Sequence, residues 1–359
     1  MALSARSLLQ PLQFSVPMPS IVFLIRALDL GGAQRQLVEL AAGLHGRGWK
    51  VHVMTFYGGG ALEQNLIKAG VALTCLNKRG RWDVPGFLWR TTRAIRSARS
   101  DVVHGYLDVA NILLAVLRPM CAGAHVVWGV RASNMDLTKY GRLAQIVYRL
   151  SVALSRFADL IICNSEAGRA YCTAQGYRKE CIVVIPNGVD VRVCRPVPYA
   201  RKQVRQEWGI DSDTELVGLV ARLDPMKDHS NFLRAAAQVA STRPKVRFVC
   251  VGAGPAGYLD LLKKDAADLG IASRMIWAGE RQDIWRVYNA LDLAVSSSLT
   301  EGTSNTLAEA MATGIACVAT DVGDSRYLLG ELGIVCPPGD STALAQSIAR
   351  ALAGAPAPA

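Results

Sequence analysis

The sequence predicts an α/β protein with two doubly wound domains, each built around a parallel sheet. Its length of 359 residues exceeds the size at which a single hydrophobic core stops growing, so two domains are expected. Short apolar runs rich in Val and Ile alternate with longer amphipathic stretches along the chain. Continuous apolar strands separated by helices are typical of parallel sheets that helices cover on both faces.

The expected elements follow one another in a regular alternation. We expect first-half strands at 21–25, 51–56, 71–76, 102–105, 126–130, 160–163 and 182–185. We expect second-half strands at 216–221, 247–252, 275–278, 293–296, 317–320 and 334–335. We expect helices at 34–46, 86–99 and 342–352, and a short helix that begins near Thr306 and ends at Gly314.

A stretch with two prolines and several basic residues, 191–206, interrupts this alternation. We place the domain boundary there, which gives an N-terminal domain at 1–195 and a C-terminal domain at 196–359. Residues 1–19 lack a cleavage site of small residues, and we expect them to form a flexible leader rather than a signal peptide.

Charge divides the chain unevenly. Residues 1–200 hold 24 Lys and Arg against 11 Asp and Glu, a net +13, and the remainder carries −2. We therefore expect the first half to meet an anionic partner. No helix-turn-helix, RNA-binding or zinc signature accompanies the charge, so nucleic acid is not the expected partner.

The nine cysteines are dispersed, with no C-x-x-C pair and no neighbouring histidine at metal-ligand spacing. They are expected to be buried, reduced thiols in a cytoplasmic protein, and no zinc site is expected. The chain also lacks an uninterrupted apolar run of about 18 residues, so no membrane span is expected.

Two loops that follow strands could bind phosphate. Gly31 and Gly32 open a helix, where backbone amides and the helix dipole favour an anion, although a plain strand-to-helix turn is the commoner explanation of such a pair taken alone. Arg222 and Lys227 flank a loop that Pro225 turns, and two cations at the end of a strand suit a diphosphate. Solvated surface cations are the alternative.

The segment Gly252-x-Gly254-x-x-Gly257 matches a dinucleotide-binding fingerprint and leaves an NAD(P)-dependent oxidoreductase as the alternative function. It does not follow the first strand of its domain, where that fingerprint normally lies. Pro255 also removes one backbone donor from the loop. We expect a turn rather than a nicotinamide site.

The segment from Ser297 to Gly314 carries two carboxylates, Glu301 before the short helix and Glu309 within it. Carboxylates accept hydrogen bonds from pairs of sugar hydroxyls, and the first amides of a helix favour phosphate. The spacing Thr306-x-x-Glu309 is equally that of a capping box, so the structural and ligand-binding roles of Glu309 both remain open.

Taken in order, these motifs resemble glycosyltransferase family 4, a group of retaining enzymes with the GT-B fold, in which two Rossmann-like domains with parallel sheets face a central cleft. The resemblance covers roughly residues 20–350. The segments that carry it are Gly31 to Gln34, Ile185 to Asp190, Gly218 to Lys227, Glu301-x7-Glu309 and Val318 to Gly323.

The resemblance implies a role for each motif. Arg222 and Lys227 would hold the diphosphate of a UDP- or GDP-sugar, Glu301 the sugar hydroxyls and Glu309 the ribose hydroxyls. The nucleotide-sugar would be a substrate, and no cofactor and no metal are implied, because cations and a helix N-terminus would neutralise the leaving group. The implied donor-binding set is Gly31, Gly32, Asn164, Arg222, Lys227, Gly252, Gly302, Ser304, Asn305, Thr306, Leu307 and Glu309.

Two departures from the family pattern concern catalysis and length. Many relatives place a histidine where this chain has Arg131, which cannot act as a base near neutral pH. We therefore assign Arg131 to charge stabilisation or acceptor phosphate binding, alongside Glu301 and His104 as the candidate catalytic residues; a lone histidine at a strand end, such as His104, is more often structural. Relatives also continue beyond the last predicted helix, so an inactive, truncated GT-B protein is a further alternative.

A basic stretch from Lys78 to Arg99 interleaves arginines with Trp82 and Trp89. It fits a peripheral membrane surface, with about 1 kcal/mol per cation near anionic lipid, and it fits equally a solvated helix whose tryptophan is in the core. On the first reading the acceptor is a lipid-linked saccharide used in cell-surface polysaccharide synthesis, on the inner face of the cytoplasmic membrane.

Overall fold

The computed structural model describes residues 18–80, 82–121, 123–131 and 142–354. It separates into two compact units, one of Met1–Gly129 with Leu154–Leu160 and one of Val130–Ala153 with Ile161–Ala359. The domain boundary expected from the sequence stays a prediction. The expected leader lies outside the described residues except for Met18 and Pro19.

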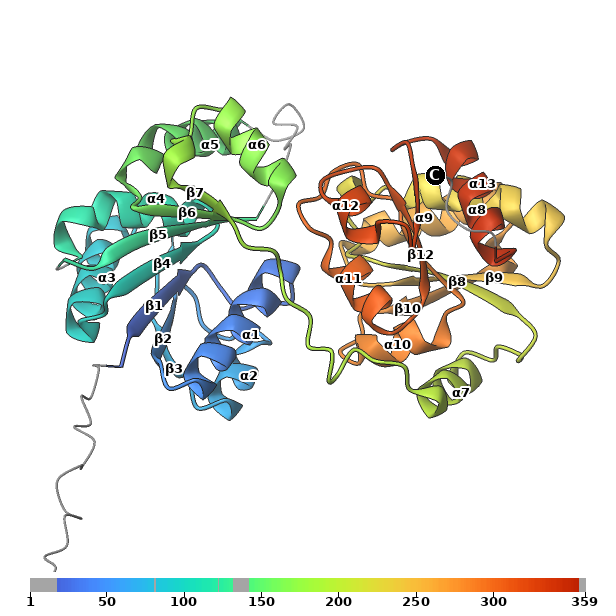
Figure 1. The fold of residues 1–359 in the computed structure, drawn as a ribbon, viewed down its shortest axis with the longest axis horizontal. Coiled ribbons are helices and arrows are strands. Elements are labelled where there is room, and N and C mark those ends of the chain that lie inside the picture. Colours follow the sequence, from blue (N-terminus) through green and yellow to red (C-terminus); the bar gives the residue numbers. More distant parts are fainter. Residues whose placement is uncertain (1–17, 81, 122, 132–141, 355–359) are drawn as a thin grey trace, which may run out of the picture. The chain divides into compact units, whose positions relative to one another are not determined.

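The first sheet has seven strands in the order β3-β2-β1-β4-β5-β6-β7 (Figure 1). Its strands are β1 Ser20–Ile25, β2 Lys50–Thr55, β3 Ala72–Cys75, β4 Val102–Tyr106, β5 His125–Val130, β6 Leu160–Cys163 and β7 Ile182–Val184. Its helices are α1 Gly32–Gly46, α2 Glu63–Lys68, α3 Val84–Ala98, α4 Asp108–Leu117, α5 Arg142–Leu154 and α6 Glu166–Ala174.

The second sheet has six strands in the order β10-β9-β8-β11-β12-β13. Its strands are β8 Glu215–Val220, β9 Val246–Val251, β10 Met275–Gly279, β11 Leu293–Ser296, β12 Ala316–Thr320 and β13 Ile334–Cys336. Its helices are α7 Pro198–Glu207, α8 His229–Thr242, α9 Ala256–Asp268, α10 Ile284–Ala290, α11 Asn305–Ala312, α12 Ser325–Leu329 and α13 Ser341–Leu352.

Every strand expected from the sequence is present and differs by no more than one residue at either end. The printed strand pairings are all parallel. The prediction of two doubly wound parallel sheets is therefore confirmed. The apolar runs predict the strands well because strands covered on both faces are apolar along their whole length.

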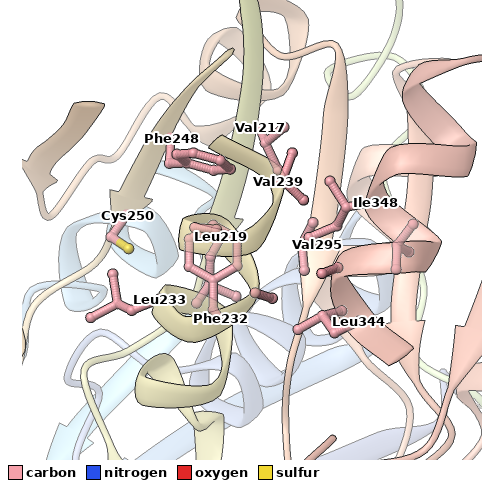
Figure 2. Close-up of a cluster of buried hydrophobic side chains, with 14 of the residues drawn as sticks. Val217, Leu219, Phe232, Leu233, Val239, Phe248, Cys250, Val295, Leu344 and Ile348 are labelled. Carbon is pink, nitrogen blue, oxygen red and sulfur yellow. The ribbon is translucent and has the colours of Figure 1, made fainter. Parts of the chain in front are cut away.

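Two apolar layers bury the second sheet. On one face, Val217, Leu219, Phe248 and Val295 pack against side chains of α8 and α13, among them Phe232 and Leu344 (Figure 2). The other face is covered by apolar residues of α7, α10, α11 and α12: Val204, Val287, Leu307 and Leu329. Burial of a large aliphatic or aromatic side chain stabilises the fold by about 1.5–3 kcal/mol, so these layers hold the strand ends in fixed positions.

The stretch in which we place the domain boundary contains most of helix α7. Helix α7 buries Ala200 and Val204, and its Arg205 is buried as well. The Arg205 guanidinium donates to the Asp292 carboxylate at 3.2 Å and to the carbonyls of Ala290 and Asp211. A basic stretch can therefore belong to the core when its charge is neutralised there.

Candidate functional site

The strand order of the second sheet reverses between β8 and β11, which are hydrogen-bonded neighbours. A crevice beyond the carboxyl ends of the strands is expected at such a switch point. The loops after these two strands are joined there: Ser297 Oγ donates to the carbonyl of Lys227 at 2.8 Å, and the Leu299 amide donates to that of Met226 at 2.9 Å.

A lysine and a glutamate from these two loops contact each other at the switch point. Lys227 Nζ donates a hydrogen bond to Glu301 Oε1, and Ser298 Oγ donates to the same oxygen at 2.7 Å. The Glu301 side chain is only 13% exposed, and that of Lys227 is also mostly covered. The sequence places these residues in separate motifs, and the fold brings them together as an ion pair.

Arg222, the other cation of this loop, lies nearer the surface. Its guanidinium contacts the Asp224 carboxylate at 2.7 Å, and its side chain is mostly exposed. Asp224 also caps the short 3-10 turn Pro225–Lys227 by accepting from the Met226 amide at 2.9 Å. The loop thus holds Lys227 inward and Arg222 outward, so the two cations face different surroundings.

Helix α11 begins beside this cluster, and its first turn corrects the capping-box interpretation. The N-cap is Ser304, whose Oγ accepts from the Leu307 amide at 3.4 Å. Thr306 is the second residue of the helix, and its Oγ1 lies 3.1 Å from Ser304 Oγ. A serine two residues earlier is in the position to reach the orphan amides, so the spacing from Thr306 to Glu309 is not a capping box.

Glu309 instead binds a residue of the neighbouring helix. Tyr288 on α10 donates its hydroxyl to Glu309 Oε2 at 3.2 Å. The tyrosine is buried, and this burial, with the Glu309 charge next to it, raises the pKa of its phenol well above the usual value. The phenol therefore stays protonated, and it orients the carboxylate as a permanent donor.

The glycines after β9 are required by packing against the loop after β8. A Cβ on Gly252 would lie 2.0 Å from the carbonyl oxygen of Ala221, and Gly252 has a φ of +149°. A Cβ on Gly254 would lie 2.3 Å from the carbonyl oxygen of Leu223, whereas Gly257 has open space. Close approach of two loops thus explains the first two glycines without a dinucleotide, as the sequence interpretation expects.

Gly302 belongs to a second close approach, at the loop between β11 and α11. Its carbonyl accepts from the Asp324 amide at 3.0 Å. A Cβ on Gly323, which has a φ of +57°, would lie 2.3 Å from the Gly302 carbonyl oxygen. The Val-Gly pair after β12 therefore lets that loop pack directly on the backbone that carries Glu301.

In the first unit, the glycine pair and His104 lie at the switch point between β1 and β4. Gly31 is the extended N-cap of α1 and Gly32 is its first residue. His104 is buried in β4, and its ring lies 5.4 Å from Phe23 and 5.0 Å from Tyr106. The ring packing gives His104 a structural role, and its catalytic role stays a prediction.

The second unit contains Arg131, Asn164 and Asn305. Arg131 donates to Asn187 Oδ1 at 2.7 Å, and Asn187 Nδ2 donates to Asn305 Oδ1 at 2.7 Å. Asn164 is buried, and its carbonyl accepts from Thr303 Oγ1. These contacts link the predicted residues to the first turn of α11.

Three supporting residues escaped the sequence interpretation: Asn187 as a donor, Ser298 and Tyr288. The partners of Asn187 and Tyr288 lie at least 21 residues away, so no local spacing indicates them, whereas Ser298 lies three residues before Glu301 in the same loop. Among the described residues, no group of three or more His, Cys, Asp or Glu side chains could hold a metal ion. In the same part of the chain, no helix is long and apolar enough to cross a membrane.

Comparison with known proteins identifies the class of protein that this fold and site belong to. Residues 30–193 match the family described as Glycosyltransferase Family 4, and residues 214–354 match the family described as Glycosyl transferases group 1. The two matches fall on the two sheets in turn and together span most of the chain. The protein therefore belongs to the glycosyltransferases of this group, and it is a transferase with the GT-B fold.

Individual relatives agree with this assignment. EpsF of Bacillus subtilis (strain 168), whose name places it among the glycosyltransferases, is 24% identical over 345 residues, which cover 93% of this chain and 88% of EpsF. The Escherichia coli UDP-Gal:alpha-D-GlcNAc-diphosphoundecaprenol alpha-1,3-galactosyltransferase is 26% identical over 241 residues, or 66% of this chain and 62% of its own.

Among solved structures, HepE of Anabaena in complex with UDP-glucose superimposes with a TM-score of 0.79 at 26% identity. The match covers 92% of this chain and 88% of that one. The same protein is also known in complex with UDP and with UDP and glucose.

Proposed function

We propose that the protein is a retaining glycosyltransferase that moves a hexose from a UDP- or GDP-sugar to a saccharide or lipid-linked acceptor in cell-surface polysaccharide synthesis. The observation that carries this proposal is the contact of Lys227, Ser298 and Glu301 beside the N-terminus of α11. A cation, a carboxylate and helix amides at one switch point match the diphosphate and hydroxyls of a nucleotide sugar.

The donor would divide among these groups by charge. Lys227 and Arg222 would neutralise the diphosphate, and the amides at the start of α11 would bind the phosphate nearest the sugar. Glu301 would accept hydrogen bonds from the hexose hydroxyls and Glu309 from the ribose hydroxyls. Uridine is the favoured base, because HepE binds UDP-glucose and the E. coli relative is named for UDP-Gal.

The chemistry would rest on orientation and electrostatic stabilisation of the leaving diphosphate. The acceptor hydroxyl would attack on the face that the diphosphate leaves, and its proton would pass to the departing phosphate oxygen. Glu301 has no place as a nucleophile, because it is assigned to the hydroxyls. Arg131 would stabilise charge or bind an acceptor phosphate, and no metal would be required.

The first experiment is a thermal shift of the purified protein with UDP, GDP, their sugar conjugates and NADH. A ligand at about 100 times its Kd should add about 2.7 kcal/mol to the free energy of unfolding, which raises Tm by several degrees. A shift with UDP or GDP and none with NADH supports the proposal. A shift with NADH alone contradicts the proposal. The absence of a shift with every nucleotide also contradicts it.

Retention and the role of Arg131 need product analysis. The anomeric proton coupling of the product, measured by NMR, distinguishes retention from inversion, and an inverted product would refute the retaining mechanism. Replacement of Arg131 by Ala should lower turnover or acceptor affinity. Unchanged values for both would remove Arg131 from the site.

A further inference from the structure

Helix α3 presents a face that the glycosyl-transfer site does not use. Phe87, Thr91 and Ile95 bury one side of the helix, and the Phe87 ring packs edge-on against Phe56 at 4.9 Å. Trp89, Arg93 and Arg96 are exposed and lie one helical turn apart on the opposite side. Helix α3 lies in the first unit, and Figure 1 labels it.

Two tryptophans of this segment are in water rather than in the core. The Trp89 side chain is 61% exposed, and Trp82, just before the helix, is 84% exposed. The guanidinium of Arg93 lies over the Trp89 ring, 5.4 Å from its centre. The alternative interpretation of a core tryptophan is therefore wrong for both residues. Exposed apolar surface with polar groups around it marks sites of interaction with proteins or membranes.

The cations of this face are not neutralised by the fold. Arg90 is the exception, because it forms an ion pair with Asp83 and donates to the Leu76 carbonyl at 2.9 Å. In the described part of the chain, no carboxylate lies within ion-pair distance of Arg93, Arg96 or Arg99. Helix α3 itself contains no Asp or Glu.

A hollow of about 670 Å³ continues the face at the end of α3. Arg96, Arg99 and His125 line it, together with Asp101. The Asp101 carboxylate is engaged by the amide and hydroxyl of Ser20, at 2.8 and 2.7 Å. The hollow is thus lined by two arginines and by one carboxylate that Ser20 already engages.

We infer that the surface of Trp89, Arg93, Arg96 and Arg99, together with the exposed Trp82 just before the helix, docks the protein on an anionic lipid bilayer. Tryptophan is suited to the interface between head groups and acyl chains, and each cation near an anionic surface adds to the attraction. This inference rests on the proposed function and adds to it the membrane that would present a lipid-linked acceptor. It does not depend on which nucleotide the donor site binds.

Nucleic acid is the less favourable occupant. A phosphate backbone would bind the arginines, but the exposed rings of Trp82 and Trp89 would have no role unless bases were unstacked. A bilayer uses the rings and the cations together, because its interface offers both anionic head groups and apolar chains. The anionic bilayer is therefore the partner to which the combination points.

The test is co-sedimentation of the full chain with vesicles of phosphatidylcholine alone and of phosphatidylcholine with phosphatidylglycerol at three to one. The variants are Arg93→Ser with Arg96→Ser, and Trp82→Ser with Trp89→Ser. The matched control is Lys263→Ser with Lys264→Ser, which removes two exposed cations from α9. UDP-induced thermal shifts of every variant check folding and the donor site separately.

We expect binding to the anionic vesicles only, weakened by salt. Loss of two arginines should weaken binding about 30-fold, because each cation contributes about 1 kcal/mol. Loss of both tryptophan rings should also weaken binding. The lysine control should bind as the parent protein does. No binding, or equal loss in the control, overturns the inference. Binding to a DNA duplex that competes with the vesicles, with the tryptophan pair dispensable, would identify a nucleic-acid surface instead. If the vesicle result holds and no nucleotide shifts Tm, the proposed function fails and the docking surface stands.

Discussion

The hydroxyl of Tyr288 donates to Glu309 Oε2 across 3.2 Å and so joins α10 to α11. Its partner carboxylate is the residue proposed to bind the ribose. The contact makes Tyr288 a positioning residue, which acts on the donor only through the orientation of Glu309.

Replacement of Tyr288 by Phe should raise the Kd for UDP about tenfold, because a hydrogen bond to a charged group contributes about 1.5–3 kcal/mol. Titration calorimetry with UDP and 2′-deoxy-UDP measures the effect. The variant should lose much of its preference for UDP over 2′-deoxy-UDP, because a misplaced Glu309 no longer accepts a hydrogen bond from the 2′-hydroxyl. Tyr327→Phe, on the exposed side of α12, is the control. A general loss of affinity for both nucleotides would indicate a structural defect only.

The ion pair between Lys227 and Glu301 predicts opposite effects on binding and on turnover. Glu301→Gln should tighten binding of UDP alone by about fivefold, because Lys227 is released from a partner worth about 1 kcal/mol. The same change should lower turnover with the sugar donor, since the amide is a poorer acceptor for the hexose hydroxyls. Calorimetry with UDP and steady-state rates test the two effects. Weaker binding of UDP in the variant would contradict this account of the pair.

The glycine fingerprint predicts a contrast between two alanine substitutions. Gly252→Ala should destabilise the protein by more than about 2 kcal/mol, because its Cβ would collide with the Ala221 carbonyl at a strained φ. Gly257→Ala has open space within α9 and should be neutral or stabilising by up to about 1 kcal/mol. Urea unfolding measures both. Equal tolerance at the two positions would refute the packing explanation.

His229 predicts the pH dependence of stability. Burial, with the charge of Lys227 nearby, lowers the pKa of this histidine to about 4 from 6.5. Between these values the unfolded chain binds more protons than the native protein, so the stabilisation is complete above about 6.5 and is lost as the pH falls toward 4. The loss amounts to about 3 kcal/mol at most.

Replacement of His229 by Phe should flatten the slope of unfolding free energy against pH in this window by about one proton. The parent protein provides the comparison. Urea unfolding at several pH values between 7 and 4.5 gives the slopes. An unaltered slope in the His229 variant would assign the pH dependence to other groups.

Much of the fold follows from local features of the sequence. Each apolar run became a strand of a parallel sheet, because burial on both faces demands apolar side chains along the whole strand. The loops that carry Lys227 and Glu301 were also predictable, since ligands bind where strands end and these loops hold the charged residues. The order of the motifs then indicated the family.

The arrangement within the site was decided by tertiary contacts. Whether Thr306 or Ser304 caps α11 depends on the residue at which the chain enters the helix, and the two possibilities have similar local patterns. The ion pair of Lys227 with Glu301 joins residues 74 apart, and Tyr288 meets Glu309 from a different helix. The exposure of Trp89 likewise depends on which side of α3 packs on the sheet.

The sequence by itself therefore determined the two parallel sheets, the family and the loops that hold the candidate site. Only the tertiary structure decided which charges are paired, which glycines are required by packing and which tryptophans face water. The physical reason is that strand and helix patterns are set by the burial of neighbouring residues, whereas ion pairs and close approaches join segments whose distance in the chain leaves no local pattern.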